Sequence, residues 1–407
     1  MNPGTSAPQR LGLVSAAGLV VASMIGSGVF VTSGFLAKDL PPAAILIGWL
    51  MGGVLAACGA LCYAAVAAAI PKSGGEYRYL HDLYHPYAGF LAGWICIVFG
   101  FAAPIAMAAM AAGAYAEVLV RPGLALPVAL FLVLALGLVQ ATGLKWGTLI
   151  QNAGVLLKVA TILLFLGGAL FSGLLDPACA LPTPALPHSL LSVPFAIGQI
   201  YIGFAYTGWS ASVYLASEVH DPVRNVPRAM LLGCGVVTLL YLLLNFVFVT
   251  TLSPAEFLQA AGSQTGSITL GHLVATRMLG AVGGRFASLM VFLVLLSTVT
   301  ALSMTGPRVC DAMARDGFLP DWARWKEGRL GGLGSVGLLT GLAAVMLVSN
   351  TFETLLNSVG VTLAIFGAMC ACAVIRLKAM TPGLWVALTV YLLGVGWSVA
   401  GSLYAYP

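Results

Sequence analysis

Long apolar runs dominate this sequence and restrict how the chain can fold. About eleven of them are long enough to cross a bilayer, which takes about 20 apolar residues in a helix. They lie at about 11–37, 42–70, 84–116, 126–144, 147–173, 191–217, 229–252, 284–312, 333–350, 354–376 and 382–405. Inside a bilayer every backbone N–H and C=O group must be paired within the protein, so such runs form helices. The sequence therefore predicts an all-α membrane protein with about 11 transmembrane helices.

Composition and charge agree with a membrane location. Hydrophobic residues make up 60% of the 407 residues and charged residues only 8%, unlike a soluble globular domain. Most Lys and Arg residues fall in the loops on one face, and the positive-inside rule then places the N-terminus in the cytoplasm. The net charge of +5 follows from this bias, so we expect the lipid bilayer and no nucleic acid as a partner. The predicted location is the plasma or inner cell membrane.

The residues that usually carry catalysis are scattered. The chain has 8 Cys and 5 His residues, but their spacing fits neither a disulfide framework nor a metal site. The centres of the predicted spans contain no cluster of His, Cys, Asp and Glu. We therefore expect no catalytic residue, no metal and no cofactor, and the protein is not predicted to be an enzyme.

Two predicted spans contain a polar, glycine-containing break near the middle. The breaks are IGSGVF at 25–30 and FAYTGW at 204–209. Unpaired backbone groups at membrane depth are tolerated only beside the protein interior or a water-filled cavity. Each break lies in the first span of a set of five, and an odd number of spans per set makes the second set inverted. This pattern is typical of a secondary transporter with its substrate site between the broken helices.

The same pattern defines the expected domain organisation. No linker rich in Pro, Gly or Ser separates soluble domains, so residues 1–407 are predicted to form a single transmembrane transporter domain. The first repeat covers about 11–173 and the second about 191–376. An accessory C-terminal helix follows at about 382–405.

The first break offers backbone amides at the start of a half-helix. Ile25, Ser27 and Gly28 are the candidates, because the positive end of a helix dipole attracts an anion such as a substrate carboxylate. In an alternative interpretation, Ala22 and Gly26 are a pair of small residues that lets helices pack closely. The presence of the second break favours the binding role.

The second break offers backbone carbonyls that accept hydrogen bonds from a substrate ammonium group. The candidates are Phe204, Ala205 and Thr207, and the two breaks together suit an α-amino acid zwitterion. Phe204 and Tyr206 are candidate gates over the ligand, and Trp209 is a candidate wall of the side-chain pocket. Aromatic residues in membrane helices also pack in the core or face lipid, and for Trp209 both interpretations stay open.

Lys158 lies roughly 17 Å inside its span, too deep for its ammonium group to reach an interface. That group could bind carbonyls of the first break and hydroxyls of the eighth span, and so replace a bound sodium ion. The hydroxyls belong to Ser297, Thr298 and Thr300. Two interpretations stay open: proton release during transport, and a permanent structural charge.

Acidic residues bear on the substrate class. A polyamine or a cationic amino acid needs a carboxylate at the far end of its site, and the span centres provide none. Glu117, near the outer end of the third span, could serve only if it faced the pocket. Neutral amino acids are therefore favoured, and the cationic class remains the alternative.

Several ordered motifs resemble the amino acid, polyamine and organocation superfamily, and within it bacterial amino-acid permeases similar to L-type amino-acid transporters. They lie at 25–30, 71–77 (PKSGGEY), 204–209, 218–229, 306–308 and 314–317. The resemblance covers roughly 10–376. It implies a five-plus-five inverted-repeat fold with alternating access, carboxylate binding at Ser27 and Gly28, and ammonium binding at the carbonyls of the sixth span with Phe204 as a gate. It also implies that Lys158 stands where sodium-coupled relatives bind an ion.

The function implied by this resemblance is sodium-independent transport of neutral L-amino acids, as an exchanger, a uniporter or a proton-coupled carrier. It does not specify the amino acid, the direction of net flux, the oligomeric state or an accessory subunit. Two departures from the family are visible. Ala65 stands where the family usually has Glu, and we predict eleven spans where the family usually has twelve.

Overall fold

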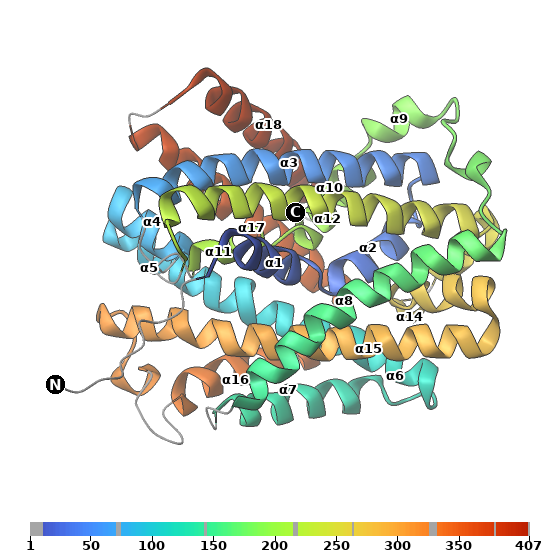
Figure 1. The fold of residues 1–407 in the computed structure, drawn as a ribbon, viewed down its shortest axis with the longest axis horizontal. Coiled ribbons are helices and arrows are strands. Elements are labelled where there is room, and N and C mark those ends of the chain that lie inside the picture. The colour runs from blue at the N-terminus through green and yellow to red at the C-terminus, as the bar shows by residue number, and fades with distance from the viewer. Residues whose placement is uncertain are drawn as a thin grey trace.

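The computed structural model describes residues 11–70, 75–141, 145–214, 219–262, 264–324, 332–377 and 380–405. In this part of the chain the structure consists of helices and connecting segments, with one β-bridge between Leu11 and Val219. Most of the long helices run along the long axis of the molecule (Figure 1). Residues 71–74 and Glu218, which belong to two of the sequence motifs, lie outside the described residues.

Among the described residues, 6 helices are long and apolar enough to cross a membrane, or up to 7 when a bent pair is included. The six are α3 (Pro42–Ala69), the continuous run of α5 (Pro86–Ile95), η1 (Cys96–Ala102) and α6 (Ala103–Leu119), α12 (Pro222–Thr251), α15 (Leu270–Arg315), α17 (Phe352–Cys372) with η5 (Ala373–Leu377), and α18 (Pro382–Ala405). The bent pair is α1 (Leu13–Met24) and α2 (Ser27–Leu36). The protein is therefore an all-helical, multi-pass membrane protein.

Four shorter apolar helices occupy the other predicted spans. They are α7 (Ala125–Ala141), α8 (Lys145–Ser172, apolar over Leu156–Ser172), α10 (Val193–Ala205) and α16 (Leu333–Ser349). The connecting segments also contain short helices and turns that the apolar pattern did not predict. These are α4 (Gly75–Leu83), η2 (Pro177–Ala180), α9 (Leu186–Leu190), α11 (Ala211–Tyr214), α13 (Pro254–Ala261), α14 (Gln264–Ile268) and η4 (Asp321–Ala323).

The first predicted break is present. Helix α1 ends at Met24, and α2 begins at Ser27 after two residues in extended conformation. The two helices form a bend of 40°. They lie nearly end to end near the centre of the molecule, with α2 on the side of α14 (Figure 1).

The second predicted break is also present. Helix α10 ends at Ala205, and a turn over 206–210 leads to α11. Gly208 has a φ of 102°, in the region that residues with a Cβ atom rarely occupy. The glycine therefore permits the chain to leave the helix at this depth.

The two breaks touch one another. A Cβ atom built on Gly28 would lie 2.5 Å from the Cα atom of Ala205, and one built on Gly208 would lie 2.7 Å from the carbonyl oxygen of Ser23. Both distances are below 3.0 Å, closer than real Cβ atoms approach a non-bonded heavy atom. The absence of side chains at these two positions is what lets the backbones of the two broken helices approach.

The end of the molecule around α2 is closed. All ten residues of α2 are buried, and α14 packs on it where Gly34 meets the backbone of Ser267. Beyond them the rings of Phe35 and Phe352 stack with centroids 5.6 Å apart. Lys38 follows in the chain, and its ammonium group forms an ion pair of 2.8 Å with Glu353.

Candidate functional site

A cavity of about 400 Å³ lies beside the two breaks, a size typical of small-molecule sites. Its walls come from α1, α2, α3, α10, α15 and α17, among others, and it extends to Glu76 and Arg308. Glu76 lies at the start of α4, at the same end of the molecule as the N-terminal end of α1 (Figure 1). Among the described residues the cavity therefore extends from the breaks toward this end of the molecule, whereas the end around α2 is filled by packed side chains.

The first break presents uncapped amides to this cavity. The first four N–H groups of a helix have no partner within it, and no side chain caps the start of α2. Ser27 and Gly28 lie in this first turn and line the cavity. Ile25 differs, because its amide donates to the carbonyl of Val21 at 3.1 Å. The amides available to an anion are thus those of the α2 turn.

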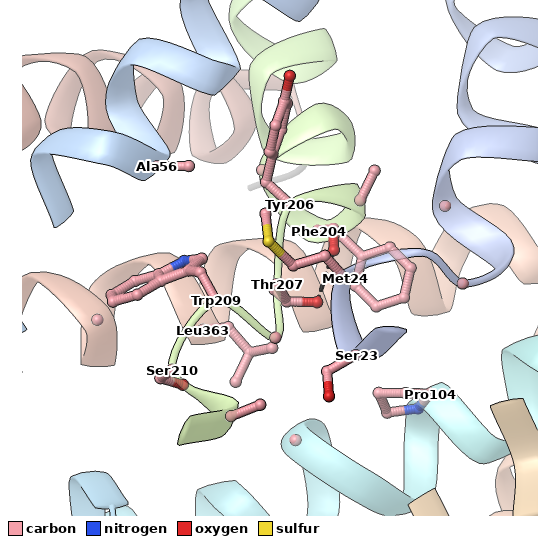
Figure 2. A pocket seen from close by; sticks show the side chains of 18 of the residues that line it. Ser23, Met24, Ala56, Pro104, Phe204, Tyr206, Thr207, Trp209, Ser210 and Leu363 are labelled. Atoms are coloured by element: carbon pink, nitrogen blue, oxygen red, sulfur yellow. Dashed lines mark hydrogen bonds between the residues drawn. The ribbon is translucent and has the colours of Figure 1, made fainter. Parts of the chain in front are cut away.

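The second break presents carbonyls that already have donors within the protein. The carbonyl of Phe204 accepts from the amide of Thr207 at 3.0 Å and from its hydroxyl at 2.6 Å, and Figure 2 shows Thr207 turned toward the Ser23 side of the cavity. The carbonyl of Ala205 lies 3.1 Å from the hydroxyl of Tyr241. A carbonyl oxygen accepts up to two hydrogen bonds, so an ammonium group would have to replace a donor at Phe204, whereas the carbonyl of Ala205 shares the single proton of Tyr241 with that of Met24.

Tyr241 of α12 joins the two broken helices. Its hydroxyl oxygen lies 2.7 Å from the carbonyl of Met24 and 3.1 Å from that of Ala205. A hydroxyl has one proton to donate, so it satisfies one of these carbonyls at a time and leaves the other as an acceptor. The sequence did not indicate this residue, because a tyrosine within an apolar span carries no distinguishing pattern.

The three aromatic candidates of the second break have different surroundings. Phe204 is 7% exposed and lines the cavity. Tyr206 is 1% exposed, donates to the carbonyl of Trp49 at 3.0 Å, and points away from Ser23 in Figure 2. Trp209 is half-buried, lines the cavity and packs edge-on against Tyr63 with centroids 4.5 Å apart. All three residues line the cavity, but Tyr206 is the most buried of them and is held by its hydrogen bond to Trp49.

Lys158 lies on the cavity wall, and its side chain is turned toward the first break. The residue is 4% exposed, and its ammonium group donates to the carbonyl of Ala22, in the last turn of α1, at 2.9 Å. Of the three predicted hydroxyl partners, Thr298 and Thr300 donate to carbonyls of their own helix, while Ser297 lines the same cavity. The lysine therefore holds α1 where that helix breaks.

Two acidic residues, Glu117 and Glu76, bear on the substrate class. Glu117 accepts hydrogen bonds from the amides of Gly123 at 2.7 Å and Ala125 at 3.3 Å, so it stabilises the connection to α7 and is absent from the described cavity wall. Glu76 does line the cavity and accepts from the hydroxyl of Ser210 at 3.3 Å. In the sequence Glu76 is part of the motif at 71–77, which suggested no specific role for this residue.

Comparison with known proteins identifies the family. Residues 11–406 match the model of a family described as amino acid permease. The chain belongs to the amino acid permease family. The resemblance inferred from the sequence motifs is thereby confirmed. A membrane protein of this family is a transporter.

Three relatives show the breadth of the family. The permease is 34% identical to the large neutral amino acids transporter small subunit 2 of Rattus norvegicus, over 88% of this chain and 68% of the relative. It is 31% identical to the Asc-type amino acid transporter 1 of Mus musculus, over 86% of this chain and 67% of the relative. It is also 31% identical to the serine/threonine exchanger SteT of Bacillus subtilis, over 77% of this chain and 69% of the relative.

Proposed function

We propose that this permease transports neutral L-amino acids across the plasma or inner cell membrane by alternating access, without sodium. One observation carries the proposal: uncapped amides of one broken helix and acceptor carbonyls of the other lie beside the same cavity. Amides attract a carboxylate and carbonyls attract an ammonium group. The relatives named as transporters or exchangers of neutral or hydroxyl amino acids support the same substrate class.

The bound amino acid would use both breaks at once. Its carboxylate would accept from the amides of Ser27 and Gly28. Its ammonium group would donate to the carbonyl of Ala205, while the Tyr241 hydroxyl keeps the carbonyl of Met24. The Thr207 hydroxyl can rotate to free one side of the Phe204 carbonyl, and the Phe204 ring would cover the ligand.

We also propose the arrangement in the membrane. The four shorter apolar helices would span the bilayer with the others, giving eleven spans, with repeats at about 11–173 and 191–376 and an accessory helix at about 382–405. With a cytoplasmic N-terminus, the cavity would open to the cytoplasm. The stacked rings of Phe35 and Phe352 and the ion pair of Lys38 with Glu353 would close the outer side.

Sodium independence rests on Lys158. Its ammonium group donates to a carbonyl at the first break, where a cation is attracted by the negative C-terminal end of α1. A fixed positive charge there makes a second cation unfavourable. The protein would thus carry its own counterpart of a coupling ion.

The alternative, a polyamine or cationic amino-acid carrier, has less support. The predicted counter-charge, Glu117, is bound to backbone amides away from the described cavity wall. Glu76 is a carboxylate on the wall, but it lies toward the open end and accepts from Ser210. A dication would therefore find no carboxylate at the depth of the breaks among the described residues.

Uptake into proteoliposomes tests this function. We expect the purified protein to exchange labelled neutral L-amino acids for internal ones at equal rates in sodium and choline chloride. An imposed pH gradient separates proton coupling from exchange, and empty liposomes test uniport. We expect that putrescine and arginine do not inhibit uptake of the labelled amino acid, either in the wild type or in Glu117→Gln. Absence of transport of every amino acid would contradict the proposal, and putrescine competition lost in Glu117→Gln would favour the alternative.

The position of the Tyr241 hydroxyl between two carbonyls leads to a separate prediction. Tyr241→Phe removes the hydroxyl that lies between the carbonyls of Met24 and Ala205, so the substrate-free protein should lose roughly 1–3 kcal/mol of stability. A bound ammonium group restores a donor, so the substrate-induced rise in Tm should be larger in the variant than in the wild type. Thermal unfolding with and without amino acid measures both quantities.

Tyr206→Phe is the matched control. Its hydroxyl is bound to the carbonyl of Trp49, away from the proposed ammonium position. This variant should also lose stability, but its substrate-induced rise in Tm should equal that of the wild type. A smaller rise in Tyr241→Phe than in the wild type would mean that the Tyr241 hydroxyl itself binds the substrate.

A further inference from the structure

One face of α10 packs tightly against α17 and α18 on the N-terminal side of Gly203. Ala196, Ile200 and Gly203 share this face, since they are four and three residues apart. A Cβ atom on Gly401 of α18 would lie 2.5 Å from the Cβ atom of Ala196, and one on Gly360 of α17 would lie 2.5 Å from Cγ2 of Ile200. The three helices are therefore in direct contact along the first turns of this face.

The contact ends at Gly203. A Cβ atom built there would have nothing within 4 Å, although the residue lies inside a membrane helix. Gly203 is exposed and lines the cavity. The space between α10, α17 and α18 thus widens at Gly203, which lies one turn after Ile200. Gly203 is two residues before the end of α10 at the break.

The cavity wall includes Gly203, Leu363, Ala364, Tyr391 and Val395, and we call the part of the cavity that these five residues line the side lobe. Leu363 and Ala364 lie on α17, and Tyr391 and Val395 lie one turn apart on α18. All are apolar except for the hydroxyl of Tyr391. The side lobe therefore has the composition of a pocket for an apolar group.

An aromatic wall closes the side lobe. A Cβ atom on Gly59 of α3 would lie 3.0 Å from Cε2 of Tyr391 and 3.3 Å from Cζ2 of Trp209, so these two rings meet beside this glycine. Tyr63 packs edge-on against Trp209. Such rings pack well against another aromatic ring.

We propose that Gly203 is a specificity-determining residue, which opens the side lobe as a subsite for a long branched or aromatic apolar side chain of the substrate. This inference rests on the proposed function. Gly203 directly precedes Phe204 and Ala205, whose carbonyls are the proposed ammonium ligands, so the α-carbon of a bound amino acid lies next to the lobe entrance. Any side chain at position 203 would occupy that entrance.

Gly203→Leu in full-length protein in proteoliposomes tests the inference. The wild type should transport leucine and phenylalanine with a higher kcat/KM than alanine. Gly203→Leu should lower the ratio of kcat/KM for leucine to that for alanine by about 10-fold or more, the size of effect that methylene groups produce in apolar pockets. The loss should appear mainly in the KM for leucine, and Gly203→Ala should give an intermediate ratio.

Gly341→Leu is the matched control. Gly341 on α16 is exposed, also has nothing within 4 Å of a built Cβ atom, and is not on the cavity wall, so this variant should keep the wild-type ratio. The inference is overturned if Gly203→Leu leaves the ratio of kcat/KM for leucine to that for alanine unchanged. It is also overturned if Gly203→Leu and Gly203→Ala reduce the transport of these two substrates equally. A wild type that transports alanine but not leucine also overturns it. A wild type that transports no amino acid overturns instead the proposed function.

Discussion

Lys158→Ala is expected to lower amino-acid exchange by roughly 10- to 100-fold while the protein still inserts and purifies. Lys158 is 4% exposed, and its ammonium group donates to the carbonyl of Ala22 at 2.9 Å. Without it, a buried carbonyl in the last turn of α1 loses its donor, at a cost of about 1–3 kcal/mol. Each 1.4 kcal/mol corresponds to about a tenfold change in an equilibrium. Initial rates of exchange in proteoliposomes measure the loss.

Two further variants separate the effect of the Lys158 charge from that of losing any positive charge. Lys158→Met keeps an unbranched side chain only one atom shorter but removes the charge and the hydrogen-bond donor, and we expect it to behave like the alanine variant. Arg121→Ala removes one positive charge from an exposed loop position, and we expect exchange within about twofold of the wild type, because exposed charges contribute little. Normal exchange in Lys158→Met would show that the charge has no part in transport. If a pH gradient drives transport in the wild type but not in the Lys158 variants, Lys158 takes part in proton coupling. If wild-type transport does not depend on pH, Lys158 acts as a permanent structural charge.

The apolar runs predicted the long helices because a membrane leaves the backbone no alternative to internal pairing. The breaks were also visible, since Gly26 and Gly208 interrupt otherwise apolar runs. The short helices α4, α13 and α14 were not visible, because polar connecting segments lack a periodic apolar signal. Their positions depend on packing against distant segments, such as that of α14 on α2.

The site was predictable only where a residue is unusual for its surroundings. Lys158 attracted attention because a charge deep in a span is costly, and the structure gives it a partner at the first break. Tyr241 and Glu76 carried no such signal, because a tyrosine in a span and a glutamate in a loop are both common. For Glu117 the sequence left open whether it faces the pocket, since it does not show that the amides of Gly123 and Ala125 bind this carboxylate.

The contact between the two breaks has the most direct mechanical consequence. Alternating access requires the half-helices to move while the ligand stays between them. At Gly28 the backbones already approach so closely that a Cβ atom would lie 2.5 Å from Cα and 2.6 Å from Cβ of Ala205. Neither atom belongs to a flexible side-chain end, so an added methyl group must push the two helices apart.

Gly28→Ala is therefore expected to lower transport by roughly 10- to 100-fold, since overpacking of this kind costs about 1–3 kcal/mol. The KM should rise as well, because the amide of Gly28 is a proposed carboxylate ligand, and the substrate-induced rise in Tm should disappear. Gly18→Ala on α1 is the control: its Cβ atom meets nothing within 4 Å, and alanine stabilises a helix by up to about 1 kcal/mol relative to glycine. That variant should transport normally and unfold at a slightly higher temperature. Wild-type kinetics in Gly28→Ala would mean that the breaks do not need this close contact at any step of the cycle.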